Sequence, residues 1–409
     1  MGNPNDIVII SAARTPFSKF GGLLKHLHSS ELGTLIIKEV LKRSGLQGSD
    51  IDEVYYGMCI QSEAALKYNV NARQALLHAG LPPETLSLTI DRACCSSLAA
   101  VQLGRKSLLL DEARVCMAVG AENMSNTPVV MNGHRWGTGL NKPEMVDHLN
   151  PIMYHGFNSL AGDAGDVALD YDVPREMQDN WAYASQMKYQ AAKTEGKFAV
   201  GEELAVVELP QRKGDPIQFT EDEFPKPDTS VEKLAKLSTV YGSKTVTAGN
   251  APGLDAGASA LILTKRSVAD SFGIKPLGVL LSVASVASGP KRIAEVPAFA
   301  IQKALDNVGM SIAQVDVLEI NEAFAAIPLV STKILANGDQ TRWEELLAKT
   351  NPNGGAIAIG HPVGASGARI IMTAMYELRR RGGGVASVGI CGGLAQGDAA
   401  VIKVDETCL

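Results

Sequence analysis

Two stretches of sixteen residues align without a gap when the chain of 409 residues is compared with itself: Ile37-Lys-Glu-Val-Leu-Lys-Arg-Ser-Gly-Leu-Gln-Gly-Ser-Asp-Ile-Asp52 and Ile301-Gln-Lys-Ala-Leu-Asp-Asn-Val-Gly-Met-Ser-Ile-Ala-Gln-Val-Asp316. Each stretch has the pattern of a helix, a glycine stop, a polar turn and the start of a strand. Repetition of such a unit predicts a duplicated fold with two similar lobes. A functional site is then expected where the lobes meet.

A second, weaker correspondence sets Ser96–Gly120 against Ser366–Ile390. Around the repeats, short β-branched runs alternate with helical patterns. Asp6–Ile10 and Glu53–Met58 are expected strands, and Leu32–Ser44 is an expected helix. This alternation predicts an α/β fold with buried sheets.

The middle of the chain has a different composition, with two tryptophans (Trp136 and Trp181) and a charged run, Gln211–Asp228, that holds three prolines. Long irregular insertions of this kind commonly carry ligand-binding surface. We therefore expect three parts. Residues 1–122 form the first part of an N-terminal lobe, and residues 123–252 form an inserted loop domain whose last part returns to the core. Residues 253–409 form a C-terminal lobe.

Composition excludes several classes of protein. The chain is 45% hydrophobic and 20% charged, unlike disordered, coiled-coil or collagen sequences. A net charge of −6 without a basic block argues against an electrostatic nucleic-acid binder. Six cysteines without a paired CxxC argue against a disulfide scaffold or a structural zinc site. With no signal peptide, peroxisomal tripeptide or long apolar run, the expectation is a soluble cytoplasmic protein with no membrane partner.

The first candidate for chemistry is Cys94, between an apolar strand pattern, Leu86–Ile90, and a helical pattern, Leu98–Leu110. Near a helix N-terminus, unpaired N–H groups and the helix dipole favour the thiolate, which is the nucleophilic form of cysteine. The alternative is that Cys94 and Cys95 are small residues packed under the helix, since most buried cysteines are inert.

His361 lies in a glycine-rich segment, residues 351–367, between Gly360 and Pro362. These neighbours fix the backbone and leave the imidazole pointing outward, where it could accept a thiol proton. The alternative is a structural histidine bonded to a loop carbonyl.

Two further residues stand at the ends of expected strands. Cys391 precedes a glycine-rich turn whose N–H groups could bind a developing oxyanion, although a lone cysteine there is usually part of the core. Asn321 ends the duplicated strand, where its amide could donate to a carbonyl oxygen or orient a water molecule. A helix N-cap is the alternative role for Asn321.

Together these stretches resemble the thiolases, the family of acetyl-CoA acetyltransferases and 3-ketoacyl-CoA thiolases. The resemblance covers nearly the whole chain, and its other motifs are Ile10-Ser-Ala-Ala-Arg-Thr-Pro-Phe17, Asn71-Ala-Arg-Gln74, Val119-Gly-Ala-Glu-Asn-Met-Ser125 and Thr245-Val-Thr-Ala-Gly-Asn-Ala251. It implies two lobes that form a five-layered α-β-α-β-α core, with an added loop domain.

The resemblance also implies a reversible Claisen condensation of two acyl-CoA molecules, or the reverse thiolysis of a 3-ketoacyl-CoA such as acetoacetyl-CoA. Cys94 would be the acylated nucleophile, His361 would accept its proton, and Cys391 would exchange the α-proton of the second acyl-CoA. Backbone N–H groups of Cys94 and Gly393 would bind one oxyanion, and His361 with a water held by Asn321 would bind the enolate. No metal or redox cofactor is required, and coenzyme A and acyl-CoA are substrates.

Contacts with coenzyme A are expected in and beside the loop domain. Lys226 replaces a family arginine near the nucleotide phosphate, Tyr241 corresponds to an aromatic near the adenine, and Phe324 lines the pantetheine tunnel. The alternatives are solvated surface for the lysine and tyrosine and core packing for the phenylalanine. Pro252 replaces a serine that reaches the pantetheine. Ser159-Leu-Ala161 replaces the His-Met-Gly of biosynthetic members, so the resemblance does not imply strict acetyl specificity.

The nucleophile turn also departs from the family, because Cys94-Cys-Ser-Ser97 replaces the usual Cys-Ser-Ser-Gly. Arg92 and the following helix assign the nucleophile to Cys94, with Cys95 as the residue to exclude. Two other functions remain open. A ketoacyl-synthase type of condensing enzyme would lack the second cysteine, and a non-catalytic scaffold would bind acyl-CoA without turnover. Arg135-Trp-Gly137 lies where relatives form tetramerisation loops, so a homodimer or homotetramer is expected.

Overall fold

The computed structural model describes residues 2–65, 67–140, 142–149 and 154–409. Residues 141 and 150–153 of the expected insertion therefore lie outside the described residues. The helices are α1 (Ser29–Ser44), α2 (Gln61–Ala65), α3 (Asn71–Ala79), α4 (Ser96–Leu109), α5 (Leu160–Asp170), α6 (Arg175–Thr194), α7 (Val231–Ala235), α8 (Arg266–Ser271), α9 (Val296–Asp306), α10 (Ala326–Leu335), α11 (Gln340–Lys349), α12 (Ala356–Ile359) and α13 (Ser366–Arg380).

Nine strands form one mixed sheet, which has two halves. The strands are β1 (Ile7–Arg14), β2 (Glu53–Gly57), β3 (Leu86–Ile90), β4 (Val115–Asn123), β9 (Ala256–Lys265), β10 (Gly278–Ala287), β11 (Val317–Ile320), β12 (Gly384–Gly392) and β13 (Gln396–Val404). Their order is β11-β12-β13-β10-β1-β9-β4-β2-β3. The halves join where β1 pairs with β10 through only two residue pairs, Val8 with Val279 and Ile9 with Gly278.

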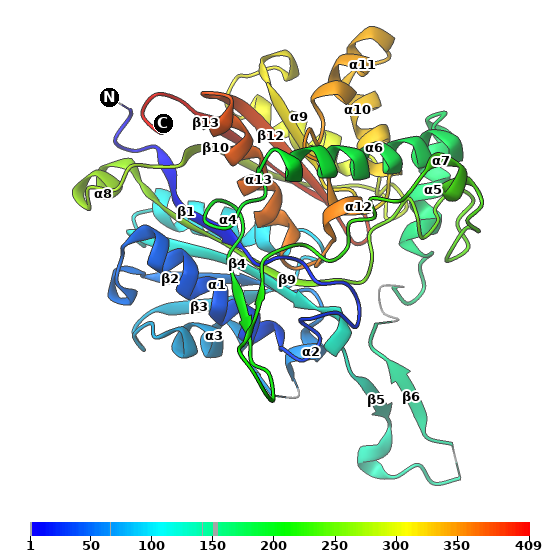
Figure 1. Ribbon diagram of the computed structural model, residues 1–409, viewed down its shortest axis with the longest axis horizontal. Helices are drawn as coiled ribbons and strands as arrows, with labels where there is room; N and C mark the ends of the chain where they lie inside the picture. The colour runs from blue at the N-terminus through cyan, green and yellow to red at the C-terminus, as the bar shows by residue number, and fades with distance from the viewer. Residues whose placement is uncertain (1, 66, 141, 150–153) are drawn as a thin grey trace.

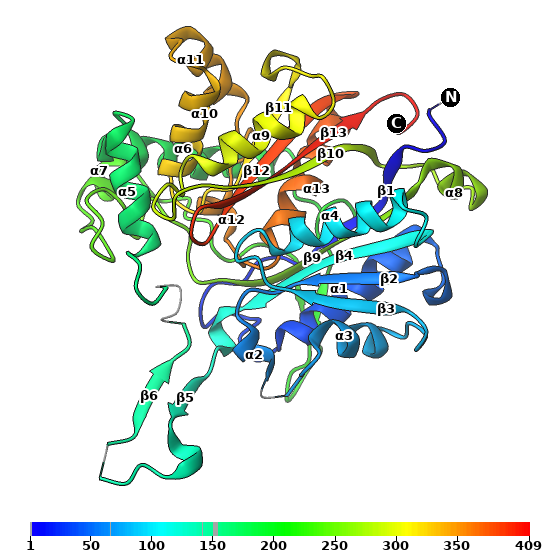
Figure 2. The ribbon, with the colours of Figure 1, turned by 180° about the vertical axis from the view of Figure 1, so that it is seen from behind.

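Helices separate and cover the two halves (Figures 1 and 2). Helices α1 and α3 cover the outer face of the first half, and α9 covers the outer face of the second, with α10 packed against it. Helices α4 and α13 lie in contact between the halves, α4 against β2 and β4 and α13 against β11 and β12. The predicted five-layered α-β-α-β-α arrangement is therefore confirmed.

The duplication predicted from the sequence is also confirmed. In both copies a glycine in the left-handed region follows the first helix: Gly45 directly after α1 with φ 73°, and Gly309 three residues after the end of α9 with φ 64°. A short 3-10 turn and a strand follow each glycine, at β2 in one half and β11 in the other. The order β2-β4-β9-β1 in the first half matches β11-β12-β13-β10 in the second. The second correspondence matches α4 with α13 and β4 with β12.

Strand β9 is the place where the topology differs from the expected division of the chain. It begins after residue 253 but belongs to the first half of the sheet, because it lies between β1 and β4 and pairs with both. The chain therefore enters the second half between Lys265 and Gly278, later than the expected boundary between residues 252 and 253.

The inserted region contributes a projecting arm and a group of helices. Strands β5 (Val129–Asn132) and β6 (Glu144–Asp147) pair as a hairpin that extends away from the core (Figure 1). Two further short strands, β7 (Val207–Leu209) and β8 (Ile217–Phe219), form a second hairpin. Helix α5 packs on α10, and α6 packs on α12. Within the described residues, none of the helices is both long enough and apolar enough to cross a bilayer.

Candidate active site

The central helices α4 and α13 begin beside each other, where the backbone N–H of Ala368 donates to the Ser97 hydroxyl over 3.0 Å. The loop before α4 then packs over β12 of the opposite half. The Cys95 thiol lies 3.6 Å from the Ile390 carbonyl oxygen, and a Cβ on Gly392 would lie 3.1 Å from the carbonyl oxygen of Arg92. The loop before α4, in the first half, therefore packs against the end of β12 in the second half.

The loop before α13 makes the reciprocal crossing over β4 in the first half. The N–H of Gly364 donates to Glu122 over 3.0 Å, and a Cβ on Gly120 would overlap the Gly364 carbonyl oxygen. Glu122 also accepts from the N–H groups of Cys59 and Ile60, at 2.9 and 3.1 Å. This double crossing brings segments from the two distant repeats of the chain to one end of the two helices.

Cys94 lies in a fixed turn between β3 and α4, as predicted. Ala93 has φ 48°, and the Ser96 hydroxyl closes the turn by accepting from Arg92 N–H at 2.9 Å and donating to the Ala93 carbonyl at 2.6 Å. Cys94 keeps some solvent exposure, whereas Cys95 is fully buried. Of the two adjacent cysteines, Cys94 is therefore the one that a substrate could reach.

The expectation that Cys94 favours the thiolate is wrong. Burial, together with the nearby carboxyl groups of Glu122 and Asp91, raises the pKa of the Cys94 thiol to about 12. Helix α4 begins at Ser96, two residues beyond Cys94, so the helix dipole does not offset the loss of solvation. At neutral pH the nucleophile candidate is a thiol that must lose its proton during the reaction.

Cys391 lies near the end of β12 and is fully buried. Burial raises the pKa of its thiol, and a negative charge on Cys94 would raise it further, so the two sulfurs are within electrostatic reach of each other. Cys391 is therefore both part of the buried core and within electrostatic reach of Cys94. Gly393, the expected oxyanion donor, follows in the tight turn between β12 and β13 and is also buried.

The backbone of His361 is held from the first half of the sheet. Its N–H donates to the Asp255 carboxylate over 2.6 Å, just before β9. Gly360 has φ 111°, and a Cβ there would lie 3.2 Å from the same carboxylate. A glycine before His361 is needed both for its conformation and for this close approach.

The imidazole of His361 is placed to act as a base through Nε2. Its Nδ1 lies 2.6 Å from the Ser366 hydroxyl, which itself donates to the Pro362 carbonyl over 2.9 Å. The hydroxyl must then accept from Nδ1–H, so Nε2 is the unprotonated ring nitrogen. Burial, together with the charge of Arg369, lowers the pKa of His361 to about 3, so the ring is neutral.

Asn321 lies directly after β11 and is fully buried beside His361. Its Nδ2 is 3.5 Å from both ring nitrogens, and its Oδ1 accepts from Arg369 over 3.2 Å. The alternative role as a helix N-cap is wrong, because α10 begins five residues later at Ala326. Asn321 and His361 are thus neighbours, Cys94 and Cys391 are within electrostatic reach of each other, and the helices α4 and α13 that follow Cys94 and His361 begin beside each other.

The residues expected to bind coenzyme A are more dispersed. Lys226 is exposed, with Nζ 4.8 Å from the Phe224 ring centroid, and its charge reaches the carboxyl group of Asp255. Tyr241 is also exposed, and its carbonyl accepts from the Ser159 hydroxyl over 2.5 Å. The other two expected contacts are partly buried, Pro252 and Phe324.

Two contributors to the site were not found from the sequence. An ion pair of 3.1 Å joins Arg92, two residues before Cys94, to the buried Asp398 on β13, and Arg92 also donates to Gln396 over 2.7 Å. Tyr154 lies against Gly393, where a Cβ would overlap the tyrosine hydroxyl. Both were missed because the partners lie far apart in the sequence, although the bulky Tyr154 beside the altered Ser159–Ala161 segment was an available signal.

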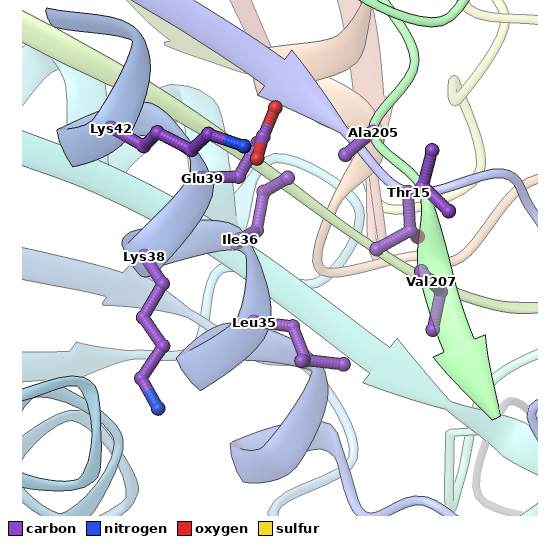
Figure 3. A pocket seen from close by; sticks show the side chains of 9 residues that line it. Thr15, Leu35, Ile36, Lys38, Glu39, Lys42, Ala205 and Val207 are labelled. Carbon is purple, nitrogen blue, oxygen red and sulfur yellow. The ribbon is translucent and has the colours of Figure 1, made fainter. Parts of the chain in front are cut away.

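Two surface hollows lie outside this group of residues. One, of about 190 Å³, lies between Lys38, Glu39 and Lys42 of α1 and the segment Ala205–Val207 (Figure 3). The other, of about 470 Å³, lies between α4 and β10 and contains Arg92 at its edge. Neither is lined by Cys94, His361 or Cys391, so the volume of a hollow does not identify this site.

Comparisons with known proteins agree with this geometry. The thiolase N-terminal domain matches residues 7–267, and the thiolase C-terminal domain matches residues 274–404. An acetyl-CoA acetyltransferase of Chromobacterium violaceum is 38% identical over 95% of this chain and 97% of its own length. A beta-ketoadipyl-CoA thiolase of Acinetobacter baylyi is 36% identical over 97% of this chain and 98% of its own.

Solved structures give the same answer. The crystal structure of human mitochondrial 3-ketoacyl-CoA thiolase superposes with a TM-score of 0.90 at 34% identity, covering 98% of this chain and 100% of that one. The human enzyme in complex with CoA has a TM-score of 0.89, again at 34% identity, over 98% of both chains. From its duplicated five-layered core, its full-length relatives and the crossing of its two cysteine-bearing segments, the chain belongs to the thiolase family of acyltransferases.

Proposed function

We propose that the chain catalyses the reversible condensation of two acyl-CoA molecules to a 3-ketoacyl-CoA, and the reverse thiolysis, through an acyl group carried on Cys94. One observation supports this proposal: the loops before α4 and α13 each cross to the opposite half of the molecule, and the candidate residues lie on these loops or at strand ends in the same half as His361. Two thiols suit this chemistry, because it contains one acyl transfer and one proton transfer at carbon.

Acyl transfer begins when Cys94 attacks the thioester carbon. His361 takes the thiol proton on Nε2, the nitrogen left free by the Ser366 contact. Burial keeps the imidazole neutral and the thiol protonated in the free enzyme, so the proton transfer is unfavourable there and must accompany the attack on the thioester. The N–H groups of Cys94 and Gly393 stabilise the negative charge that develops on the thioester oxygen.

Condensation then needs an α-carbanion from the second acyl-CoA. Cys391 removes the α-proton, and the resulting enolate oxygen is held by His361 and by a water bound to Asn321. In thiolysis Cys391 returns that proton to the departing acyl-CoA. The thioester itself supplies the activation, so these residues need no metal or redox cofactor.

We assign coenzyme A to the inserted region, on the side of His361 where Asp255 holds its backbone. Lys226 supports this placement, because its charge reaches Asp255, the carboxyl group that holds the His361 backbone. Tyr241 offers an exposed ring to the adenine, while Pro252 and Phe324 border the pantetheine arm. The thiolase neighbour solved in complex with CoA is consistent with this substrate class.

We also propose a homo-oligomer, a dimer or tetramer, that works in the cytoplasm. Strand β3 is the edge of the sheet and exposes Leu86 and Leu88. Unpaired sheet edges with apolar side chains favour pairing with a second chain. The projecting β5–β6 arm also exposes large apolar side chains, among them Met131, Trp136 and Met145. Sedimentation or light scattering on the purified protein measures the number of subunits.

Thiolysis of acetoacetyl-CoA with free CoA tests the activity. The wild-type protein should cleave this substrate. Cys94→Ala should lower kcat by at least about 1000-fold, because the nucleophile is lost. Cys95→Ala is the matched control, and it should retain most of the activity because the Cys95 thiol is fully buried, 3.6 Å from the Ile390 carbonyl oxygen. Full activity in the Cys94 variant would show that another group carries the acyl chain.

A further inference from the structure

Tyr154, in the inserted region, lies against the turn that follows Cys391. It is half-buried, and its carbonyl accepts from the N–H of Phe157 over 3.0 Å in the turn that precedes α5. Its phenol lies against Gly393, two residues after Cys391. A Cβ at Gly393 would overlap the hydroxyl and two ring carbons of Tyr154, so this glycine is required by the approach of the tyrosine.

A short series of contacts joins Tyr154 to the nucleophile turn. Gly392 adjoins Gly393, and a Cβ on Gly392 would lie 3.0 Å from the Cys95 sulfur and 3.1 Å from the Arg92 carbonyl oxygen. Burial raises the pKa of Tyr154, and negative charges on Cys94, Cys59 and Asp91 would raise it further. The phenol is therefore a neutral hydrogen-bond donor at physiological pH, close to the sulfur that would carry the acyl group.

We propose that Tyr154 is a specificity-determining residue of the acyl site. Its ring forms a wall beside Gly393 that limits the acyl group on Cys94 to a short chain, and its hydroxyl donates to the oxygen of that acyl group. The inference rests on the proposed function and deepens it by naming the substrate class: short-chain 3-ketoacyl-CoA such as acetoacetyl-CoA. The physical basis is steric, because a rigid aromatic ring occupies the space that further methylene groups would need.

Two substitutions separate the ring from the hydroxyl. Thiolysis is measured with acetoacetyl-CoA and with 3-ketodecanoyl-CoA. Tyr154→Ala removes the wall and should raise the ratio of kcat/KM for the long over the short substrate by at least about tenfold, since a pocket discriminates about 10- to 200-fold per methylene. Tyr154→Phe keeps the ring, so this ratio should stay unchanged while both values fall about fivefold through the lost hydrogen bond. An unchanged ratio in Tyr154→Ala would overturn the proposal.

A second measurement does not depend on turnover. Cys94 is alkylated with iodoacetamide and with the bulky N-pyrenylmaleimide, and labelling is localised by peptide mass spectrometry. Tyr154→Ala should raise the rate of the bulky reagent relative to the small one by at least about tenfold, whereas Phe157→Ala, an exposed aromatic in the same turn, should not. Equal rate ratios in all three proteins would reject the wall. If no acyl-CoA is turned over, the proposed function fails, and labelling still decides the role of Tyr154.

Discussion

The two halves of the molecule share one backbone plan but carry different side chains at matching positions. In the alignment that sets Ile37 on Ile301, Gly57 at the end of β2 corresponds to Asn321 after β11. In the alignment that sets α4 on α13, Cys94 corresponds to Gly364, and Ala121 on β4 corresponds to Cys391 on β12. At each of these positions one half carries a cysteine or an asparagine, and the other half carries a glycine or an alanine.

The small residues are required by the crossing of the loops. A Cβ on Gly364 would lie 2.8 Å from the Ala121 carbonyl oxygen and 3.0 Å from the Gly57 carbonyl oxygen. A Cβ on Gly57 would approach the backbone of Ser96 and Ser97 to 2.5 Å. The absence of a side chain at Gly364 lets the α13 loop pass close to strands of the first half, and its absence at Gly57 lets the start of α4 pack on β2. In the proposed mechanism the nucleophile, Cys94, comes from one half, and the two bases, His361 and Cys391, come from the other.

The largest expected effect is on the rate of thiolysis, and it separates the contribution of Cys391 from that of Cys94. Cys391→Ala removes the proton carrier of the second half and should lower thiolysis by about 100- to 10,000-fold, the range of general acid–base catalysis. Acylation of Cys94 by acetyl-CoA, which uses His361, should persist in this variant. Intact-protein mass spectrometry after mixing with acetyl-CoA measures the acylation. Loss of acylation together with thiolysis would mean that the halves do not divide the chemistry in this way.

The next test concerns protonation of the nucleophile. Because burial holds the Cys94 pKa at about 12, the thiolate fraction of the free enzyme should rise about tenfold with each pH unit well below that value. Alkylation of Cys94 by iodoacetamide should therefore increase about 100-fold between pH 7 and pH 9. Cys94→Ala identifies any labelling of other thiols. A plateau near neutral pH would instead reveal a preformed thiolate paired with protonated His361.

A smaller effect is expected at the ion pair that ties the halves together. Arg92→Ala leaves the buried Asp398 carboxylate unpaired and should lower the free energy of unfolding by about 2–4 kcal/mol, with thiolysis about tenfold slower. Adding Asp398→Asn should restore most of the stability but not the rate, because the Cys94 loop is no longer tied to β13.

The matched control for this ion pair lies on the surface. Lys193→Ala breaks a solvent-exposed pair with Glu221 and should cost no more than about 1 kcal/mol by denaturant unfolding. If Arg92→Ala costs no more than the control, the pair does not hold the two halves together.

Local sequence patterns predicted much of the architecture. The repeat at Ile37 and Ile301, the glycine stops and the turn at Cys94 were all predictable, because helix periodicity and turn chemistry act over a few residues. Motif resemblance supplied the candidate residues of the site. The pKa of Cys94 was predicted in the wrong direction, because desolvation comes from segments far away in the chain. The same reason hid the Arg92–Asp398 pair and the contact between Tyr154 and Gly393.

The account depends most on acyl transfer to Cys94, the accessible member of the adjacent pair Cys94 and Cys95. Acid quenching of the protein shortly after mixing with acetyl-CoA, followed by fragmentation of the labelled peptide, locates the acyl group at single-residue resolution. We expect the group on the sulfur of Cys94, with Cys95 in the same peptide unmodified. An acyl group on Cys95 or Cys391, or a protein that remains unacylated, would contradict the central claim.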